Sequence, residues 1–206
     1  MIELLIRDYS PGDFIGVLDV YRDALRSLKV SKGGKHPDAS IDKAISASDE
    51  DMFGQIAGYG VLLVAEVKGT NEIVGIGSLG TGRLNHLIGS TYSRAHYVKL
   101  AYQKGRMGVN VGTVLRQATI RRASSMGFRK VFGHATVESV GFHSRFGARF
   151  FPSYDMKNPD GSIAGCYYEF IIRESLLNNL PLEPFVFWVQ DSFVALIRHF
   201  RKKKGR

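Results

Sequence analysis

Three glycines, Gly105, Gly108 and Gly112, lie close together just before an apolar segment of helical spacing. Glycine lets the backbone come close to a ligand and take conformations that are closed to other residues. The first turn of a helix offers N–H groups without intrahelical partners and the positive end of the helix dipole. Glycines at the start of a helix therefore predict a cradle for a phosphate group.

The elements on both sides of these glycines must position the cradle. His96–Ala101 has the composition of a short strand, and the segment after the glycines predicts a helix that ends at Gly127. An apolar stripe runs along this helix, whereas three arginines fall largely outside it. The stripe contains Val111, Val114, Leu115, Ala118 and Ile120, and the arginines are Arg116, Arg121 and Arg122.

Two common nucleotide-binding motifs are absent from this loop. The Walker motif needs a lysine before the Ser or Thr that closes the glycine run, and here Thr113 follows Gly112 directly. The dinucleotide pattern G-x-G-x-x-G is also missing. The sequence therefore argues against a nucleoside triphosphatase.

The loop resembles the coenzyme A pyrophosphate loop of the GCN5-related N-acetyltransferases, which is a strand, Gln/Arg-x-x-Gly-x-Gly/Ala and a helix. Gly112 and Leu115 match the second glycine and a helix leucine of that family. In this register Asn110 stands at the first glycine and Met107 at the Gln/Arg position. We expect Asn110 to replace the glycine because asparagine tolerates positive φ better than most residues. Gln103 or Arg106 then supplies the polar group from a longer loop.

A second segment strengthens this resemblance. The strand Lys130–Thr136 is followed by Glu138–Phe150, which is similar to the closing pattern of the family, Asn-x-x-Ala-x-x-Leu-Tyr-x-x-x-Gly-Phe. The glycine of that pattern corresponds to Gly147, and the tyrosine to His143. Thr136, Ser139 and Phe142 stand at the asparagine, alanine and leucine of the pattern.

The resemblance implies an α/β (α+β) architecture, the acyl-CoA N-acyltransferase fold. In it a mixed, mostly antiparallel sheet is splayed at its centre and flanked by helices. We expect this domain to cover residues 1–175, with a separate tail at 176–206. The other elements we predict are a strand Ile2–Asp8, a helix after Ser10–Asp13, a hairpin of Tyr59–Val67 and Glu72–Leu79, a connection Gly80–Ser93, and a last strand Cys166–Arg173. The polar segment Ser27–Asp51 is either a solvated connection with a short helix around Ile41–Ile45 or a substrate lid.

The family's chemistry is acyl transfer to an amine, with acetyl-CoA as cosubstrate. Amine attack on a thioester needs a deprotonated amine, a polarised carbonyl and a proton source for the thiolate. The resemblance places the thioester on backbone N–H groups within Tyr97–Ala101, and the pyrophosphate over Arg106–Gly112. The coenzyme residues it implies are Val98, Leu100, Gln103, Arg106, Met107, Gly108, Val109, Asn110, Val111, Gly112, Thr113 and Ser139.

Four side chains are the catalytic candidates. His143 stands where the family has its tyrosine, so it is either the general acid or a histidine that only packs. His96 and Glu66 are candidates for the general base, as is His134, and strand alternation leaves open which of them faces the site. The single cysteine, Cys166, carries no sign of activation, and we expect no metal site.

Composition agrees with an ordinary globular domain. The chain has 206 residues, 44% of them hydrophobic, which suffices for a core. One cysteine favours a reducing compartment, and neither a signal-peptide pattern nor an 18-residue apolar run is present, so we expect a cytoplasmic protein.

The tail is the second unusual feature of the chain. Pro184–Phe200 is apolar and aromatic, and from Arg198 onward the tail carries six positive charges and no acid. The rest of the chain therefore holds only +3 of the formal +9, which argues against a nucleic-acid surface within the fold. The tail either packs on its own domain or on a homodimer partner, or contacts a membrane surface or an acidic partner.

These patterns together predict an N-acetyltransferase that moves an acetyl group from acetyl-CoA to a primary amine on a small molecule or peptide. Two alternatives stay open. One is a long-chain N-acyltransferase that uses acyl-CoA or an acylated carrier protein near a membrane. The other is a non-catalytic module that binds coenzyme A or a partner.

Overall fold

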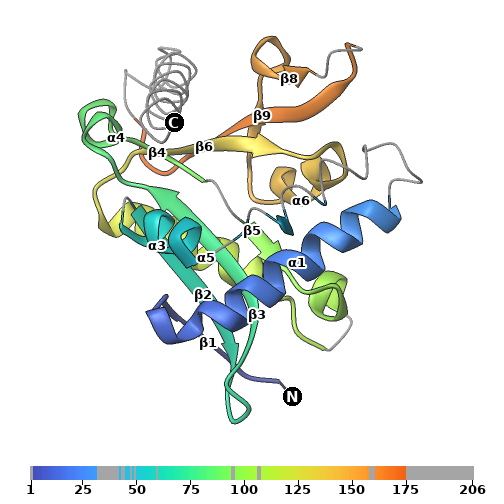
Figure 1. The fold of residues 1–206 in the computed structure, drawn as a ribbon. Coiled ribbons are helices and arrows are strands. Elements are labelled where there is room, and N and C mark those ends of the chain that lie inside the picture. The colour runs from blue at the N-terminus through green and yellow to red at the C-terminus, as the bar shows by residue number, and fades with distance from the viewer. Residues whose placement is uncertain are drawn as a thin grey trace, which may run out of the picture. The chain divides into compact units, whose positions relative to one another are not determined.

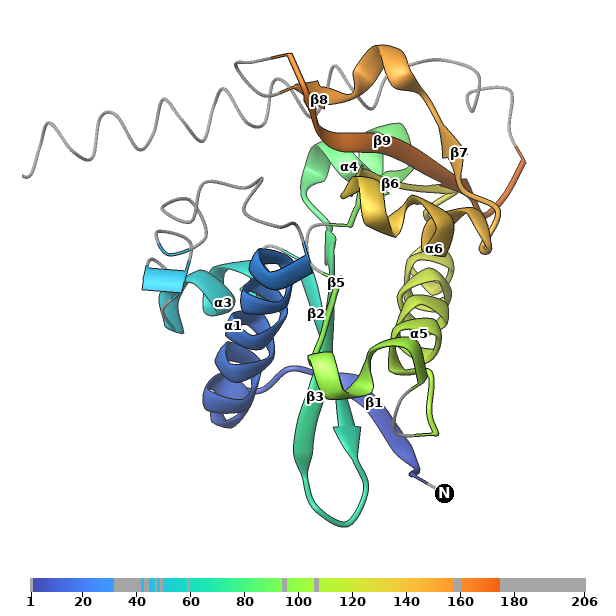
Figure 2. The same ribbon diagram turned by 90° about the vertical axis from the view of Figure 1, so that its right-hand side faces the viewer.

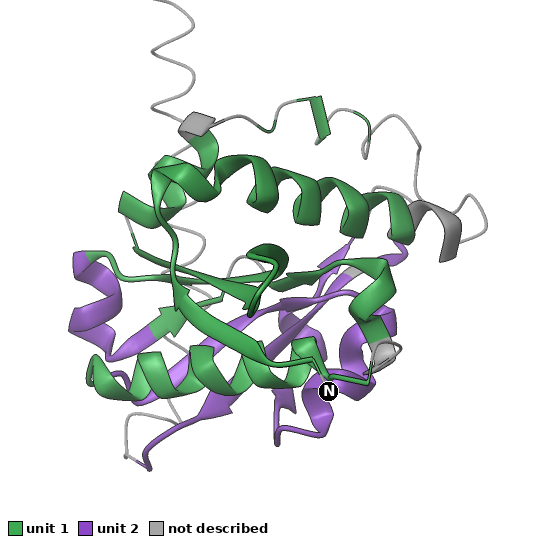
Figure 3. Cartoon of the chain, turned by 90° about the horizontal axis from the view of Figure 1, so that it is seen from below, with its two compact units in different colours: residues 1–82, 91–127 green, residues 83–90, 128–206 purple. Residues whose placement is uncertain are grey.

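The computed structural model describes residues 2–31, 42, 45–46, 48, 50–58, 60–93, 96–105, 108–157 and 161–174 (Figure 1). The predicted tail and most of the polar segment 27–51 lie outside these residues. The chain forms two compact units, which Figure 3 colours separately. Unit 1 consists of residues 1–82 and 91–127, and unit 2 of residues 83–90 and 128–206.

Unit 1 is built on an antiparallel sheet. Strand β1 (Leu4–Asp8) pairs with β2 (Gly60–Val67), and β2 forms a hairpin with β3 (Glu72–Gly80). The short strand β5 (His96–Val98) pairs with the other edge of β3, and Tyr92 of β4 (Ser90–Tyr92) pairs with Gly80. The predicted hairpin is confirmed, and Asn71 in its turn has a φ of 57°.

Helices cover both faces of this sheet (Figure 2). Helices α1 (Phe14–Ser31) and α3 (Glu50–Gly58) lie on one face, and α5 (Val111–Ser125) lies on the other. Because side chains on a strand alternate between faces, neighbours on β2 serve two cores. Leu62 and Val64 pack with Val17, Val20 and Phe53, whereas Leu63 and Ala65 pack with Val98, Val111 and Leu115.

Helix α5 packs very close to β3 because two residues of that strand that face the helix, Gly75 and Gly77, are glycines. A Cβ at Gly75 would lie 3.0 Å from a methyl carbon of Val111, and a Cβ at Gly77 would lie 3.0 Å from the hydroxyl oxygen of Thr119. The predicted helix stop is also confirmed, since α5 ends at Ser125 and Gly127 follows with a φ of 82°. Arg116 was expected outside the apolar stripe, but it is fully buried and donates to Ser93 Oγ at 3.2 Å.

Unit 2 is organised around β9. Strand β6 (Lys130–Ala135) and β7 (Arg149–Phe150) both pair antiparallel with β9 (Ile163–Ile171), and β8 (Met156–Lys157) forms a short hairpin with it. The helices are α4 (Arg83–Ile88) and α6 (Val140–Ser144). Its core is aromatic, with Phe132, Tyr167, Tyr168 and Phe170 all buried.

A buried ion pair also belongs to unit 2. Lys130 Nζ lies 3.0 Å from a carboxylate oxygen of Glu169, and the side chains are 1% and 7% exposed. The hydroxyl of Tyr167 donates to the other carboxylate oxygen at 2.9 Å. The mixed α/β composition with mainly antiparallel strands and flanking helices is confirmed in both units.

Two of the expected elements differ from the structure. The predicted strand His96–Ala101 ends at Val98, and Leu100–Gly105 forms a 3-10 helix, η2. The predicted connection Gly80–Ser93 contains the six-residue helix α4 and the strand β4. The splay expected at the centre of the sheet stays a prediction, because β5 and β6 belong to different units.

The close approach of α5 to β3 generates a stability prediction. Gly77→Val places two methyl groups against Thr119 and Leu115, and overpacking of this kind costs about 1–3 kcal/mol. We therefore expect a lower free energy of unfolding in urea. The matched control is Gly54→Val on the exposed side of α3, where a Cβ meets no atom within 4 Å. Equal stability of the two variants would contradict the close approach.

Candidate functional site

The end of β5 carries a backbone N–H that points away from its partner strand. The N–H of Lys99 donates to the carbonyl of Val74 on β3 at 3.0 Å. Successive N–H groups on a strand alternate between the two sides, so the N–H of Tyr97 also points toward β3 and that of Val98 points away from it. Within the predicted stretch Tyr97–Ala101, Val98 thus presents a donor on the side of β5 that faces away from β3.

After Val98 the chain continues into η2, and two hydrogen bonds hold this junction. The N–H of Leu100 donates to Asp23 Oδ2 on α1 at 2.5 Å, so it is no donor for a ligand. Gln103 Nε2 donates to the carbonyl of Val98 at 2.9 Å. Gln103 was expected to reach a phosphate, but in this structure its amide closes the turn behind the strand end.

The loop between η2 and α5 is open at its glycine. Gly108 has a φ of 73°, a value that residues other than glycine rarely adopt, and a Cβ there would meet nothing within 4 Å. Val109 packs beside Val98 and Val111 in the core under the loop. Arg106 and Met107, both expected to contact the coenzyme, lie outside the described residues.

Asn110 does not replace a positive-φ glycine, which corrects our expectation. Its φ is −97°, and its side chain accepts a hydrogen bond from the N–H of Thr113 at 3.1 Å. Asn110 is therefore the N-cap of α5, a role that asparagine fills well because its short side chain reaches the third N–H of the helix. The positive φ belongs to Gly108, two residues earlier.

Two donors at the start of α5 remain for a ligand. The first intrahelical bond runs from Val114 N–H to the carbonyl of Asn110, and Thr113 N–H is capped. The N–H groups of Val111 and Gly112 have no intrahelical acceptor because of their position in the first turn. No acidic residue lies in that turn. The positive end of the helix dipole and two N–H groups thus form a site for an anion.

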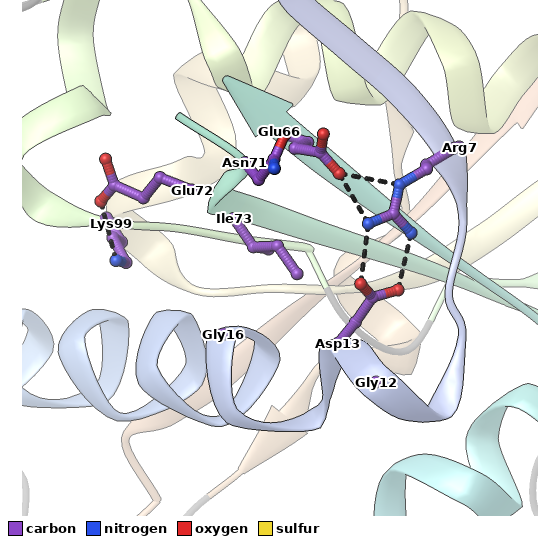
Figure 4. A pocket seen from close by; sticks show the side chains of 9 residues that line it. All are labelled: Arg7, Gly12, Asp13, Gly16, Glu66, Asn71, Glu72, Ile73 and Lys99. Carbon is purple, nitrogen blue, oxygen red and sulfur yellow. Dashed lines mark hydrogen bonds and ion pairs between the residues drawn. The ribbon is translucent and has the colours of Figure 1, made fainter. Parts of the chain in front are cut away.

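Glu66 lies in a different place from the end of β5. Ala65 and Val67 face α5, so Glu66 faces α1, where it helps to line a pocket of about 540 Å³ (Figure 4). His96 shares a face with Val98, because they are two residues apart on one strand. The structure therefore separates the two predicted general bases onto opposite faces of the sheet.

The carboxylate of Glu66 is engaged by Arg7. Arg7 lies 2.6 Å from Glu66 Oε2 and binds both carboxylate oxygens of Asp13 at 2.6 and 2.7 Å. This hydrogen bonding by Arg7 lowers the pKa of Asp13 from 3.8 to about 2, against the opposing effect of burial. Asp13 also accepts the N–H of Ser10 and so caps the turn that starts α1. Arg7 and its two acids therefore form a structural clamp on one side of the pocket.

A second charged group lines the other side of the pocket. Lys99 Nζ lies 2.7 Å from Asp19 on α1 and 2.9 Å from Glu72 at the start of β3. The hydrogen bond from Lys99 lowers the pKa of Glu72. Burial alone lowers the pKa of Lys99, but its bonds to the two acids outweigh burial and raise it. Tyr102 OH donates to the other oxygen of Glu72 at 2.9 Å.

The remaining candidates belong to unit 2. His143 is 5% exposed, and its ring stacks on Tyr168 with centroids 4.4 Å apart. Ser139 Oγ donates to the carbonyl of Thr136 at 2.9 Å, at the start of α6. Nε2 of His134 lies 3.4 Å from the carbonyl of Tyr154, and burial lowers its pKa. The roles of His143 and Ser139 at the coenzyme stay predictions, since the loop lies in unit 1.

Two further classes of site were searched for in the described part of the chain. No group of three or more His, Cys, Asp or Glu side chains there has a geometry suited to a metal ion. No described helix combines the length and the apolar character that a membrane span requires.

Sequence comparison and structure comparison give different results for this chain. No family model matches it, and no curated protein matches it. Many solved structures share its fold. A PaiA N-acetyltransferase from Thermoplasma acidophilum, solved with coenzyme A, is 15% identical with a TM-score of 0.61, over 82% of this chain and 99% of that one.

Two further structures agree. A GCN5-related N-acetyltransferase from Rhodopseudomonas palustris is 19% identical, over 83% of this chain and 98% of that one, with a TM-score of 0.62. The ribosomal-protein-S18-alanine N-acetyltransferase of Escherichia coli is 11% identical, over 84% and 96%, with a TM-score of 0.58. The chain therefore has the fold of the GCN5-related N-acetyltransferases.

Sequence reasoning missed the acids that hold the end of β5. Asp19 and Asp23 are four residues apart on α1, so they lie on one face of that helix. Their spacing is visible in the sequence, but many exposed helices show acids at such spacing. Glu72 was assigned to a strand without a role. Only the structure pairs these acids with Lys99, Leu100 and Tyr102.

The cap of α5 generates a prediction. Asn110→Ala leaves Thr113 N–H without its acceptor, and loss of such a cap costs about 1 kcal/mol of stability. We expect a lower urea midpoint with an unchanged slope. Asn110→Asp keeps an acceptor at the same distance and serves as the control. If the alanine variant proved as stable as the aspartate variant, Asn110 would not be the cap.

The clamp of Arg7 generates a second prediction, on pH. Because the pKa of Asp13 is depressed to about 2, its contribution is present above pH 3.8 and is lost as the pH falls toward 2. The shift corresponds to about 2 kcal/mol, of which ~1 kcal/mol disappears between pH 5 and 3. Urea unfolding at these two pH values should show a smaller difference in Arg7→Gln.

The control for this measurement is Lys68→Gln. Lys68 forms an exposed ion pair with Glu3 in the same unit, and exposed pairs contribute little to stability. The control should keep the pH dependence of the wild-type protein. A pH dependence that Arg7→Gln leaves intact would show that other acids cause it.

Proposed function

We propose that this chain is an N-acetyltransferase that moves an acetyl group from acetyl-CoA to a primary amine by direct attack. One observation carries the proposal. In unit 1, an outward N–H at the end of β5 is followed by an open glycine loop and then by two free donors at the start of α5. The fold of this chain is found in N-acetyltransferases, one of which was solved with coenzyme A.

The described residues fit a coenzyme with a pyrophosphate. The N–H groups of Val111 and Gly112 would hold phosphate oxygens, and the dipole of α5 favours their charge. The empty space beside Gly108 admits a ligand close to the backbone. Acetyl-CoA supplies the activated acetyl group as a thioester. The outward N–H of Val98 is suited to polarise a carbonyl oxygen by a hydrogen bond.

We assign the acid and the base of the reaction from the contacts and positions of the candidate side chains. Glu66 is held in an ion pair with Arg7 and lies on the α1 face, opposite to the face of Val98, so we do not assign the base to it. His96 lies two residues before Val98 on the same strand and is half-buried, so we assign the base to it. His143 stays the proposed general acid by its motif position, although its burial against Tyr168 also suits a packing role.

The acceptor is a small-molecule or peptide amine. Structures with this fold include an aminoglycoside 6'-acetyltransferase, with 12% identity and a TM-score of 0.60. Their range, which also covers the alanine of a ribosomal protein, shows that one fold serves both kinds of acceptor. A long-chain acyl donor and a membrane contact both depend on the tail, which lies outside the described residues.

The test is calorimetric titration with acetyl-CoA and with a long-chain acyl-CoA, for the wild-type protein and for Gly112→Trp. The indole would cover the two donors at the start of α5, and each hydrogen bond to a charged group contributes about 1.5–3 kcal/mol. We therefore expect at least about tenfold weaker binding of acetyl-CoA. Gly54→Trp, on the exposed side of α3, is the matched control.

Activity separates the enzyme from the alternatives. Thiol release from acetyl-CoA in the presence of amines is expected for the wild-type protein. Tight binding without thiol release for any amine would indicate a non-catalytic coenzyme-binding module. Preference for the long-chain donor would favour the long-chain N-acyltransferase, and binding of neither donor would reject the coenzyme site.

A further inference from the structure

The segment between β5 and the glycine loop is held by several hydrogen bonds and ion pairs, most of them to groups far away in the sequence. Val98 accepts a hydrogen bond from Gln103, Lys99 forms two ion pairs, and Leu100 donates to a helix acid. Such a dense set of contacts fixes one conformation in a short stretch. The stretch ends at Gly105, directly before the loop that would hold the coenzyme.

Glu72 joins two of these contacts. One carboxylate oxygen accepts from Lys99 Nζ and the other from Tyr102 OH, both at 2.9 Å. Tyr102 is 8% exposed, and its ring packs in the same core as Val98 and Val111. Glu72 thus connects Lys99, directly after β5, to Tyr102, which packs in the same core as the start of α5.

Stability alone does not explain this group of charges. The side chains of Glu72 and Asp19 are 42% and 61% exposed, and ion pairs of that exposure contribute little to folding. These ion pairs instead constrain the orientation of the side chains that they join. Both acids hold Lys99, and Glu72 also holds Tyr102, at the turn from β5 into η2 that precedes the glycine loop.

We infer that Glu72 and Tyr102 are positioning residues of the donor site. Their hydrogen bond orients the end of β5 and the start of the coenzyme loop, without contact with the reacting atoms. This inference rests on the proposed function. It assigns the pair to donor binding, so the loss of the bond raises KM for acetyl-CoA and leaves kcat nearly unchanged.

The experiment compares Tyr102→Phe, Glu72→Gln and the double variant with the wild-type protein. Phenylalanine keeps the ring in the core and removes only the hydroxyl group, so the fold is preserved. We expect KM for acetyl-CoA to rise about three- to tenfold in each single variant, with kcat within a factor of about two. Tyr102→Phe removes one of the two contacts that Glu72→Gln weakens, so the double variant should be no worse than Glu72→Gln alone.

Hydrogen exchange gives a readout that does not depend on activity. The amides of Lys99 and Leu100, which donate to Val74 and Asp23, should exchange faster in both single variants than in the wild-type protein. Glu3→Gln is the control, because it breaks the exposed pair with Lys68 in the same unit and should change neither exchange nor KM.

The outcomes separate this inference from the proposed function. A wild-type protein that binds no coenzyme would overturn the proposed function, and this inference with it. Normal coenzyme binding with unchanged KM in Tyr102→Phe and Glu72→Gln would overturn the inference alone. Unchanged exchange at Lys99 and Leu100, or KM effects that add in the double variant, would also overturn it.

Discussion

The close packing of α5 on β3 is the constraint on which the arrangement of unit 1 depends. At Gly75 and Gly77 the strand presents no side chain to the helix, so Val111, Leu115 and Thr119 pack close to its backbone there. Because α5 is held so near β3, its first residue, Val111, packs in the same core as Val98 of β5, the strand that pairs with β3. The donors at the start of α5 and the outward N–H of Val98 therefore belong to one region of unit 1, although twelve residues of loop and 3-10 helix separate Val98 from Val111 in the chain.

The opposite face of the same sheet is the one that α1 covers. There α1 is attached through two groups of charges, Arg7 with Asp13 and Glu66, and Lys99 with Asp19 and Glu72. In each group one cation is shared by two acids, so the pocket between them holds more negative than positive charge. A coenzyme phosphate is repelled by such a surface and attracted by the start of α5. The two faces of unit 1 are thus electrostatically different, and the proposed anion site lies on the α5 side.

Most of the fold was readable from the sequence because its signals are local. Alternating apolar residues predicted the β2–β3 hairpin, and a helical stripe with a glycine stop predicted α5. The length of β5 was not readable, because Leu100 is bound by an acid 77 residues away. The burial of Arg116 was equally hidden, since its partner Ser93 is on a different element. At the site, sequence reasoning found the loop and its glycines, but it gave Asn110 the backbone role that Gly108 has.

The exchange of roles between Gly108 and Asn110 accounts for the weak match between this loop and the family motif. A phosphate cradle needs free N–H groups and a chain that can approach closely, and neither property requires a given side chain. Asn110 uses one N–H of the first turn for capping, which leaves Val111 and Gly112 as donors. The positive φ of the loop is found at Gly108 instead of Asn110. Backbone donors survive such substitutions, provided that the helix start stays in place. A site of this kind is therefore preserved by packing and by the contacts that orient its strand, more than by the residues that touch the ligand.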